Sequence, residues 1–165
     1  AAASSNEKLD LCKQQGADST VLYSRDNMDR DSQKNFSSEL KALTNNKGVD
    51  VVFDPVGGAY SEPALRAIAW KGRYLVIGFT SSIPSIPLNL ALLKGCQIIG
   101  VFWGAFCMRE PNINNENFHQ LFLMYEKGQI KPFVTETFPL EQTAEAINKL
   151  ANRNAIGKIT ISVID

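Results

Sequence analysis

A short apolar run that ends in an acid, a proline and two glycines has the composition of a strand leading into a ligand-binding turn. The run covers residues 49–53, and Asp54 and the turn Pro55-Val56-Gly57-Gly58 follow it. Its valines and phenylalanine predict a strand that is buried on both faces. In open α/β sheets, ligands bind beyond the carboxyl ends of the strands, and glycines let the backbone approach them closely. We therefore expect one wall of a binding crevice here, with Asp54 and Val56 among its residues.

Asp54 and the two glycines each allow two interpretations. Asp54 can orient a ribose or a loop amide, or it can cap the turn that follows it. Gly57 and Gly58 can admit a cofactor, or they can supply the positive φ angles that a turn requires. The sequence alone leaves these roles open.

Residues that usually perform acid–base, nucleophilic or metal chemistry are sparse. His119 is the only histidine, and it lies in a predicted helix with no evident acid or nucleophile as partner, so we expect a solvent-facing or packing role. Cys12, Cys96 and Cys107 lack the spacing of a zinc site or a disulfide framework. No G-x-S-x-G elbow is present. We therefore predict no metal site and assign no catalytic residue.

Length and charge narrow the classes of partner. The chain has 165 residues, 44% hydrophobic and 21% charged, which is typical of one globular domain. Its 17 basic and 17 acidic residues cancel, so charge favours neither nucleic acid nor an anionic membrane as a partner. No apolar stretch reaches membrane-spanning length. The cysteine pattern fits a reduced compartment, and we expect a cytoplasmic location, with a mitochondrial one as the alternative.

Helices and strands are predicted to alternate up to residue 103. Periodicity and capping residues predict helices at 6–15, 36–43, 61–69 and 88–94, and strands at 20–23, 49–54, 73–78 and 97–103. The polar stretch 24–34 is expected to be a loop or the start of a helix. Because right-handed crossovers place successive strands in parallel, this order predicts an α/β fold with a doubly wound, Rossmann-type parallel sheet.

The alternation is less regular after residue 103. We expect a loop at 107–115, a helix that ends at Gly128, a strand within 130–138, a helix at 140–151 and a terminal strand at 157–164. We therefore divide the chain into a partial dinucleotide-binding domain, residues 1–129, and a C-terminal segment, residues 130–165, that packs against a separate domain.

The turn that normally binds the pyrophosphate of a dinucleotide is not found in the sequence. In such domains the turn G-x-G-x-x-G joins the first strand to the first helix, and this chain has no match to it. Ala1-Ala2-Ala3 leads into a predicted helix as a second strand would. We therefore expect the chain to begin inside a fold, truncated at its N-terminus, with the phosphate loop upstream of Ala1.

The segment after Ala3 carries hydroxyls and a cation where NAD-selective sites carry an acid. Ser4, Ser5 and Lys8 suit the 2′-phosphate of NADPH, since an acid at this position would instead accept from a ribose hydroxyl. The alternative is a solvated helix start with a surface lysine.

The order of motifs resembles one known family along essentially the whole chain. The motifs are Ala2-Ala3-Ser4-Ser5-x-x-Lys8, Gln15-Gly16-Ala17-Asp18, residues 48–58, Gly72-Arg73-x-Leu75-Val76-x-Gly78-Phe79, Val101-Phe102-Trp103-Gly104 and Gly157-Lys158-Ile159-Thr160-Ile161. Together they resemble the cofactor half of the quinone oxidoreductase branch of the medium-chain dehydrogenase/reductase superfamily. The resemblance implies NADPH binding and hydride transfer to a small quinone or α,β-unsaturated carbonyl, without zinc.

The same resemblance implies three groups of cofactor-binding residues. Lys8, Tyr23 and Arg153 are expected near the adenosine 2′-phosphate. The nicotinamide side is expected to be lined by Gly78, Phe79 and Thr80, and the carboxamide and ring to meet Val101, Phe102 and Trp103.

The chain lacks two parts of the family pattern, which are the N-terminal substrate domain and the first βα unit. We expect residues 130–165 to return to that substrate domain, and an accompanying segment or a strand-exchanged homodimer to complete the sheet. A non-enzymatic structural or binding role, like that of a crystallin, is the alternative to oxidoreductase activity, because fold does not fix function.

Overall fold

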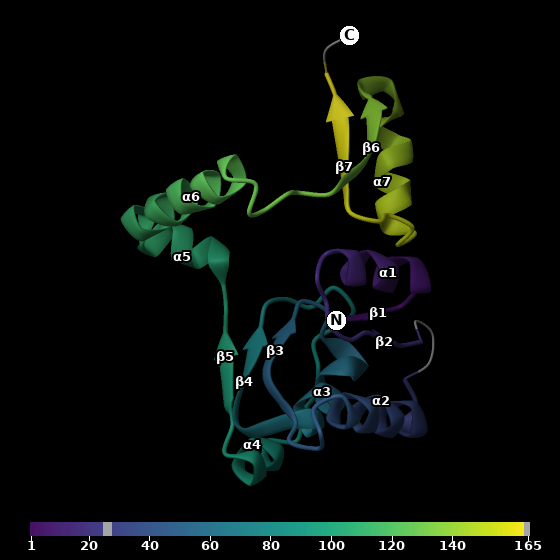
Figure 1. Ribbon diagram of the computed structural model, residues 1–165, viewed down its shortest axis with the longest axis vertical. Helices are drawn as coiled ribbons and strands as arrows, with labels where there is room; N and C mark the ends of the chain where they lie inside the picture. The colour runs from purple at the N-terminus through teal and green to yellow at the C-terminus, as the bar shows by residue number, and fades with distance from the viewer. Residues whose placement is uncertain (25–27, 164–165) are drawn as a thin grey trace. The chain divides into compact units, whose positions relative to one another are not determined.

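The computed structural model describes residues 1–24 and 28–163, which form two compact units, Ala1–Trp103 and Gly104–Asp165 (Figure 1). The predicted loop or helix start at 24–34 falls partly outside the described residues, as does the end of the strand predicted at 157–164.

The first unit alternates strands and helices as predicted. Its elements are β1 (Ala2–Ala3), α1 (Asn6–Gln14), β2 (Val21–Leu22), α2 (Arg30–Ala42), β3 (Val49–Asp54), a 3₁₀ turn η1 (Gly58–Tyr60), α3 (Ser61–Ala67), β4 (Ile68–Val76), α4 (Asn89–Lys94) and β5 (Gln97–Gly100). Strand β4 starts earlier than predicted, because the helix before it ends at Ala67, and Lys71, in the predicted turn, has a φ of 63° within the strand.

All strand pairs in the first unit are parallel. Strands β1 and β2 form one pair, and β3, β4 and β5 form a three-stranded sheet in that order. At the end of β3, Asp54 pairs with Val76 of β4, so the carboxyl ends of these two strands lie at the same edge. The prediction of a parallel α/β fold is confirmed.

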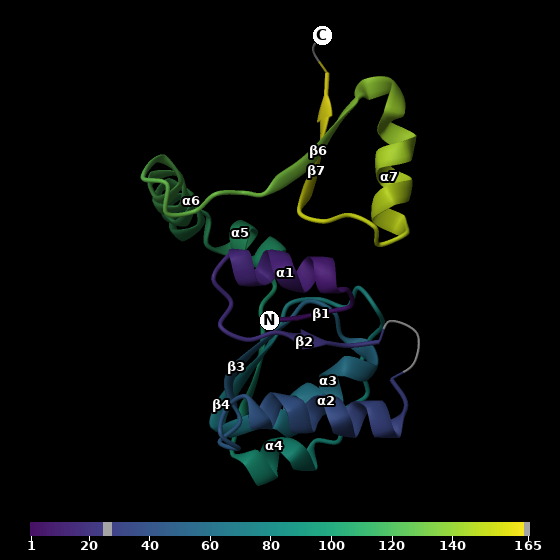
Figure 2. The same cartoon turned by 45° about the vertical axis from the view of Figure 1, so that its right-hand side comes forward.

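Capping and core residues explain why these segments fold as they do. The Ser5 side chain accepts a hydrogen bond from the Lys8 amide at the start of α1, and Asp29 accepts one from Ser32 at 2.8 Å at the start of α2. The core joins both sheets to their helices through Val21 of β2, Phe36 of α2, Leu65 of α3, Ile68 and Tyr74 of β4 and Leu90 of α4. Helices α2 and α3 lie beside each other in both ribbon views (Figure 2).

The prediction that β3 is buried on both faces is wrong. Val51 is 39% exposed and Phe53 is 65% exposed. Within the described residues β3 pairs with β4 on one side only, and its other side lines a cavity described below. Strand β5 is also exposed at most of its positions, and it ends at Gly100 rather than at the predicted Trp103.

The second unit contains a helical part and a βαβ part. It includes α5 (Trp103–Arg109), whose first residue belongs to the first unit, α6 (Pro111–Glu126), β6 (Val134–Pro139), a 3₁₀ turn η2 (Leu140–Gln142), α7 (Thr143–Ala151) and β7 (Lys158–Ser162). Strands β6 and β7 pair in parallel. Lys149 of α7 contacts Glu136 of β6 at 2.5 Å, which ties the helix to this pair.

The loop predicted at 107–115 is wrong. Residues 107–109 end α5 and residues 111–115 begin α6. Pro111 occupies the first turn of α6, where a missing amide hydrogen costs nothing, and this was the available sequence signal. None of the described helices is long and apolar enough to cross a membrane.

Candidate functional site at the ends of β3 and β4

Two loops run side by side beyond the carboxyl ends of β3 and β4. We call residues 55–58 and 77–82 the paired loops. Their backbones continue the strand pairing, since the Ser81 amide donates to the Val56 carbonyl at 2.9 Å and the Gly58 amide donates to the Ser82 carbonyl at 2.7 Å. The Thr80 amide and hydroxyl both donate to the Pro55 carbonyl, at 3.4 and 3.2 Å. The two loops therefore form one continuous wall.

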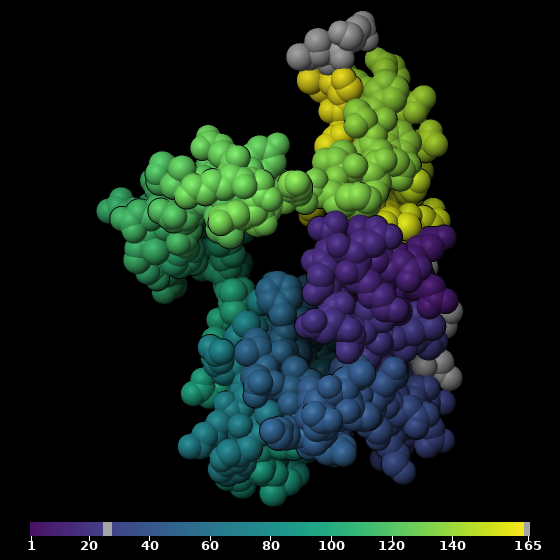
Figure 3. Space-filling model, viewed as in Figure 1, coloured from purple at the N-terminus to yellow at the C-terminus, as the bar shows by residue number. Residues whose placement is uncertain are grey.

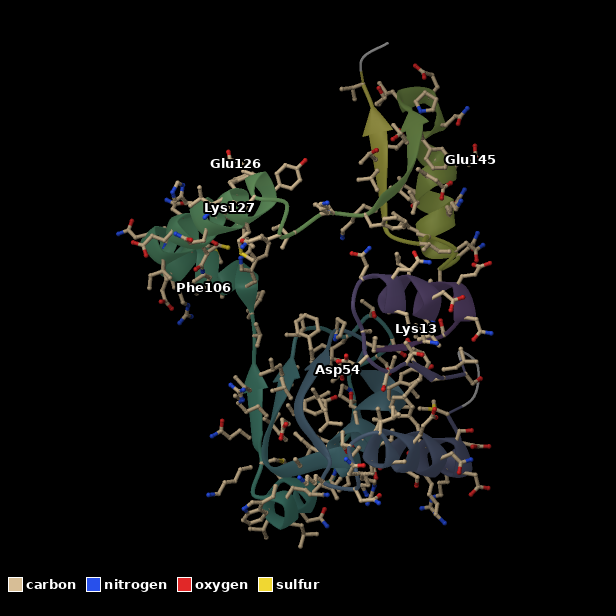
Figure 4. All side chains as sticks on the ribbon, viewed as in Figure 1. Lys13, Asp54, Phe106, Glu126, Lys127 and Glu145 are labelled. Atoms are coloured by element: carbon tan, nitrogen blue, oxygen red, sulfur yellow. The ribbon has the colours of Figure 1, made fainter. Side chains whose placement is uncertain are left out.

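The Asp54 carboxylate organises the start of this wall. Its Oδ1 accepts hydrogen bonds from the amides of Val56 at 2.8 Å and Gly57 at 2.9 Å. Its Oδ2 accepts one from the Ser61 hydroxyl at 2.8 Å and one from the Tyr74 hydroxyl. The sequence left open whether Asp54 orients a ribose or a loop amide, or caps the turn that follows it. In the structure Asp54 caps that turn. Figure 4 labels Asp54 at the end of β3.

The surroundings of Asp54 favour its ionised form. Burial acts to raise the pKa of Asp54, but hydrogen bonds from Tyr74, Gly57, Ser61 and Val56 lower it below the usual value of 3.8. Burial, together with the hydrogen bond to Asp54, raises the pKa of the Tyr74 hydroxyl. At neutral pH the pair is therefore a carboxylate that accepts from a neutral phenol.

The paired loops require glycine at positions 57 and 58 but not at position 78. Gly57 has a φ of 71° and Gly58 a φ of 61°, and a Cβ on Gly57 would lie 2.6 Å from the Ser82 carbonyl oxygen. Both glycines therefore allow the close approach of the paired loops. At Gly78 a Cβ would meet only the Pro55 oxygen, at an ordinary 3.6 Å, and no positive φ occurs there. The protein's own packing thus leaves room for a methyl group at Gly78.

An apolar cavity of about 500 Å³ adjoins the wall and separates β3 from β1 and β2. A hollow is visible in Figure 3 between the purple N-terminal segment and the blue atoms of the α2 region. The cavity is lined by residues in or next to β1, β2, β3 and α2, which include Ala1, Ala2, Val21, Tyr23, Phe36, Leu40, Val49, Val51, Phe53, Asp54, Val56 and Tyr60. The exposed edge of β3 thus faces an apolar space.

An aromatic cluster links the end of β2 to the 3₁₀ turn after the wall. The rings of Tyr23 and Tyr60 are 4.7 Å apart, and Tyr23 packs edge-on against Phe36 at 6.2 Å. The Tyr60 hydroxyl donates to the Ser24 carbonyl at 2.8 Å. Tyr23 therefore lies close to the 3₁₀ turn that follows the first of the paired loops.

The structure brings together some of the predicted site residues. Asp54, Val56, Gly78, Phe79 and Thr80 are joined in or beside the paired loops, and Tyr23 shares the cavity lining with Asp54 and Val56. Ser4 and Ser5 follow β1, but neither they nor Lys8 line the cavity.

The remaining predicted residues are spread over other positions. The Val101 amide extends the ladder by donating to the Val76 carbonyl at 2.9 Å, whereas Phe102 and Trp103 follow it with largely exposed side chains. Arg153 follows α7 in the second unit and has a φ of 57°.

Tyr74 and Ser61 are site residues that the sequence analysis missed. They lie 20 and 7 residues from Asp54. The Tyr74 hydroxyl reaches the carboxylate because β4 pairs with β3 in this register, and the Ser61 hydroxyl reaches it because α3 begins directly after the turn that follows β3. An acid at the end of one strand and a tyrosine on the next strand is a usable signal once the register is known.

Metal ligands do not gather in the described part of the chain. Residues 1–24 and 28–163 contain no group of three or more His, Cys, Asp or Glu side chains placed to hold a metal ion. His119 is exposed on α6, in line with the solvent-facing alternative.

Comparison with known proteins identifies the family. The family model described as zinc-binding dehydrogenase matches residues 15–161. Quinone oxidoreductase-like protein 2 of Bos taurus is 35% identical over 164 residues, which cover 99% of this chain and 45% of that protein. A NAD-dependent alcohol dehydrogenase of Saccharolobus solfataricus is 29% identical over 156 residues, or 92% of this chain and 39% of that protein. The chain thus spans less than half the length of these relatives.

Solved structures share the fold. The mycobacterial protein Rv1454c complexed with NADPH superposes with a TM-score of 0.84 at 22% identity, covering 98% of this chain and 49% of that one. The predicted Rossmann-type architecture is confirmed by this likeness. The chain belongs to the zinc-binding dehydrogenase family, within the medium-chain dehydrogenase/reductase superfamily, and its resemblance to the quinone oxidoreductase branch is confirmed.

Proposed function

We propose that this chain is the cofactor-binding portion of an NADPH-dependent oxidoreductase that transfers hydride to a quinone or an α,β-unsaturated carbonyl. The observation that carries the proposal is the wall at the ends of β3 and β4. Gly78 lies in this wall, although the surrounding protein atoms leave room for a side-chain methyl group at that position. Parallel α/β sheets bind ligands at this edge, and glycine backbone lets a ligand approach closely. The oxidoreductase family of the chain supports the same reading.

The residues of the wall would hold and orient the cofactor. Bound nicotinamide supplies the hydride, so the protein's work is to position the ring and exclude water. Gly78, Phe79 and Thr80 would border the ring, with Val56 beside them. Val101, Phe102 and Trp103, after the neighbouring strand β5, would meet the carboxamide and ring. The groups that face the acceptor would come from the substrate domain.

The preference for NADPH over NADH would come from the residues after β1. Ser4, Ser5 and Lys8 would present hydroxyls and a cation to a 2′-phosphate, and Tyr23 is proposed near the same phosphate. Ser5 Oγ already accepts from the Lys8 amide, so Ser5 would act as a donor toward the phosphate. The solved NADPH complex supports this choice, whereas the NAD-dependent relative favours NADH and makes cofactor preference the property to measure.

The apolar cavity between β1 and β3 would receive a parallel strand from a further segment of the same protein. The exposed edge of β3 and the apolar lining favour such an occupant over solvent. A strand in this position would carry a glycine-rich turn to the carboxyl edge of the sheet, beside the wall. We propose that the longer protein contains this strand and the substrate domain, and that it is a homodimer.

Replacing Lys8 tests the cofactor assignment. In the longer protein, Lys8→Ala is expected to weaken NADPH binding by about tenfold or more, because a charge-assisted hydrogen bond contributes about 1.5–3 kcal/mol. NADH binding should change little. Lys13→Ala, at the exposed last turn of the same helix, is the matched control and should leave both dissociation constants unchanged.

Titration of cofactor fluorescence measures both constants. An equal loss for the two cofactors would exclude a 2′-phosphate contact by Lys8. Turnover is measured separately as NADPH oxidation with small quinones and enones, and binding without turnover of any acceptor would favour the crystallin-like alternative.

A further inference from the structure

We infer that Asp54 is a positioning residue that locks the paired loops into one rigid wall, and that it makes no direct contact with a bound ligand. The inference rests on the proposed function for its effect on cofactor binding, but its structural basis is independent of it.

All acceptor positions of the Asp54 carboxylate are in use. A carboxylate offers about four lone-pair sites, two on each oxygen. Oδ1 accepts from the amides of Val56 and Gly57, and Oδ2 accepts from the hydroxyls of Ser61 and Tyr74. A ribose hydroxyl would have to displace one of these donors. Ser61 and Tyr74 are 1% and 2% exposed, so a displaced hydroxyl would lose its partner away from water.

The donors come from three separate segments. Val56 and Gly57 belong to the first paired loop, Ser61 begins α3, and Tyr74 lies within β4. The carboxylate therefore fixes the first loop relative to both the helix and the strand that precedes the second loop. Because the Gly58 amide donates to Ser82 and the Ser81 amide donates to Val56, the geometry that Asp54 imposes on its own loop extends to the other one.

Close contact between the loops makes this coupling stiff. A Cβ at Gly58 would lie 2.8 Å from the Ser81 hydroxyl oxygen, and one at Gly57 would lie 3.0 Å from the Phe79 ring. A shift of either loop must consequently be followed by the other. Phe79 and Thr80, the residues proposed beside the nicotinamide, would thus be placed by an acid that they do not touch.

Hydrogen exchange in the ligand-free chain tests the coupling. Asp54→Ala should speed exchange at the amides of Val56 and Gly57, which lose their acceptor, and also at Gly58 and Ser81, which Asp54 does not contact. We expect an increase of about tenfold at all four amides. Tyr74→Phe, which removes one donor of the four, should give a smaller increase. Faster exchange at Val56 and Gly57 alone would mean that Asp54 is a local cap and would overturn the inference.

A conservative variant separates positioning from ligand contact. In Asp54→Asn the carboxamide oxygen can still accept from both amides, and its NH₂ group can donate to the two hydroxyls, since each hydroxyl can also accept. In the longer protein, Asp54→Asn should therefore weaken NADPH binding by less than about threefold, and Asp54→Ala by about tenfold. Equal losses in the two variants would contradict a positioning role. If the wild-type protein does not bind NADPH, the proposed function fails, and the exchange experiment still decides the coupling.

Discussion

Single residues in the wall separate stability from ligand binding. Gly57 has φ and ψ of 71° and −151°, a combination essentially restricted to glycine, and it packs directly on Ser82. Gly78 has neither constraint. The two glycines lie in the same pair of loops, one in each, so they form a matched pair for mutation.

Alanine substitutions at the two glycines should affect different properties, protein stability for Gly57 and cofactor binding for Gly78. Gly57→Ala is expected to lower the free energy of unfolding by about 2 kcal/mol or more, because it adds strain and a steric clash. Gly78→Ala should leave stability within about 0.5 kcal/mol but weaken NADPH binding in the longer protein, since the methyl group would occupy the space proposed for the cofactor. Urea unfolding and cofactor titration measure the two effects. A Gly78→Ala protein that binds normally would remove Gly78 from the site.

The ionisation of Asp54 should be visible in the acid stability of the chain. Its pKa in the folded state is lowered from 3.8, so its contribution is present above that value and is lost as the pH falls through the folded pKa. Between about pH 5 and pH 2, the wild-type chain should therefore lose stability more steeply than Asp54→Asn, which has no charge to lose at this position. Urea midpoints measured across this range check the expectation, and parallel curves would contradict it.

At the scale of elements, local signals predicted helices and strands well and their burial poorly. Ser5 and Gly95 mark the start of α1 and the end of α4 because capping is a property of a few adjacent residues. The apolar composition of β3 predicted full burial, yet Phe53 is exposed, since burial depends on neighbouring strands that the sequence of β3 does not specify.

In the candidate site, too, local features were recognisable from the sequence, whereas contacts between separate elements were not. The turn after Asp54 was recognisable from proline and glycine, and so was the loop after Gly78. The Tyr74 and Ser61 hydroxyls were not, because their contact with Asp54 depends on strand register and on the angle at which α3 leaves the turn. The loop predicted at 107–115 is wrong for a local reason, since Pro111 lies in the first turn of α6, where proline is tolerated.

At the scale of the whole molecule, the cavity between β1 and β3 distinguishes this chain from the longer protein that we propose. Phe53 lines the cavity and is 65% exposed, whereas Leu65 is fully buried in the core of the first unit. A strand placed in the cavity would cover Phe53 and leave the surroundings of Leu65 unchanged.

Truncating these two side chains should therefore reveal whether the cavity is filled. In this chain alone, Phe53→Ala should cost no more than about 1 kcal/mol of unfolding free energy, and in the longer protein about 3–5 kcal/mol, as for a buried phenylalanine. Leu65→Ala should cost about 2–5 kcal/mol in both. Denaturant unfolding of the two polypeptides supplies the comparison. A small Phe53→Ala cost in both would mean that no strand covers β3.

The backbone pairing of residues 55–58 with residues 77–82 has a consequence for protein engineering. Each loop uses the other's carbonyls and amides in a fixed order, from Asp54 with Ile77 to Gly58 with Ser82. Inserting one residue into either loop would misalign every later donor with its acceptor. Grafts intended to change ligand preference would therefore have to transplant both loops at their present lengths, and natural relatives that differ here are expected to differ in both loops at once.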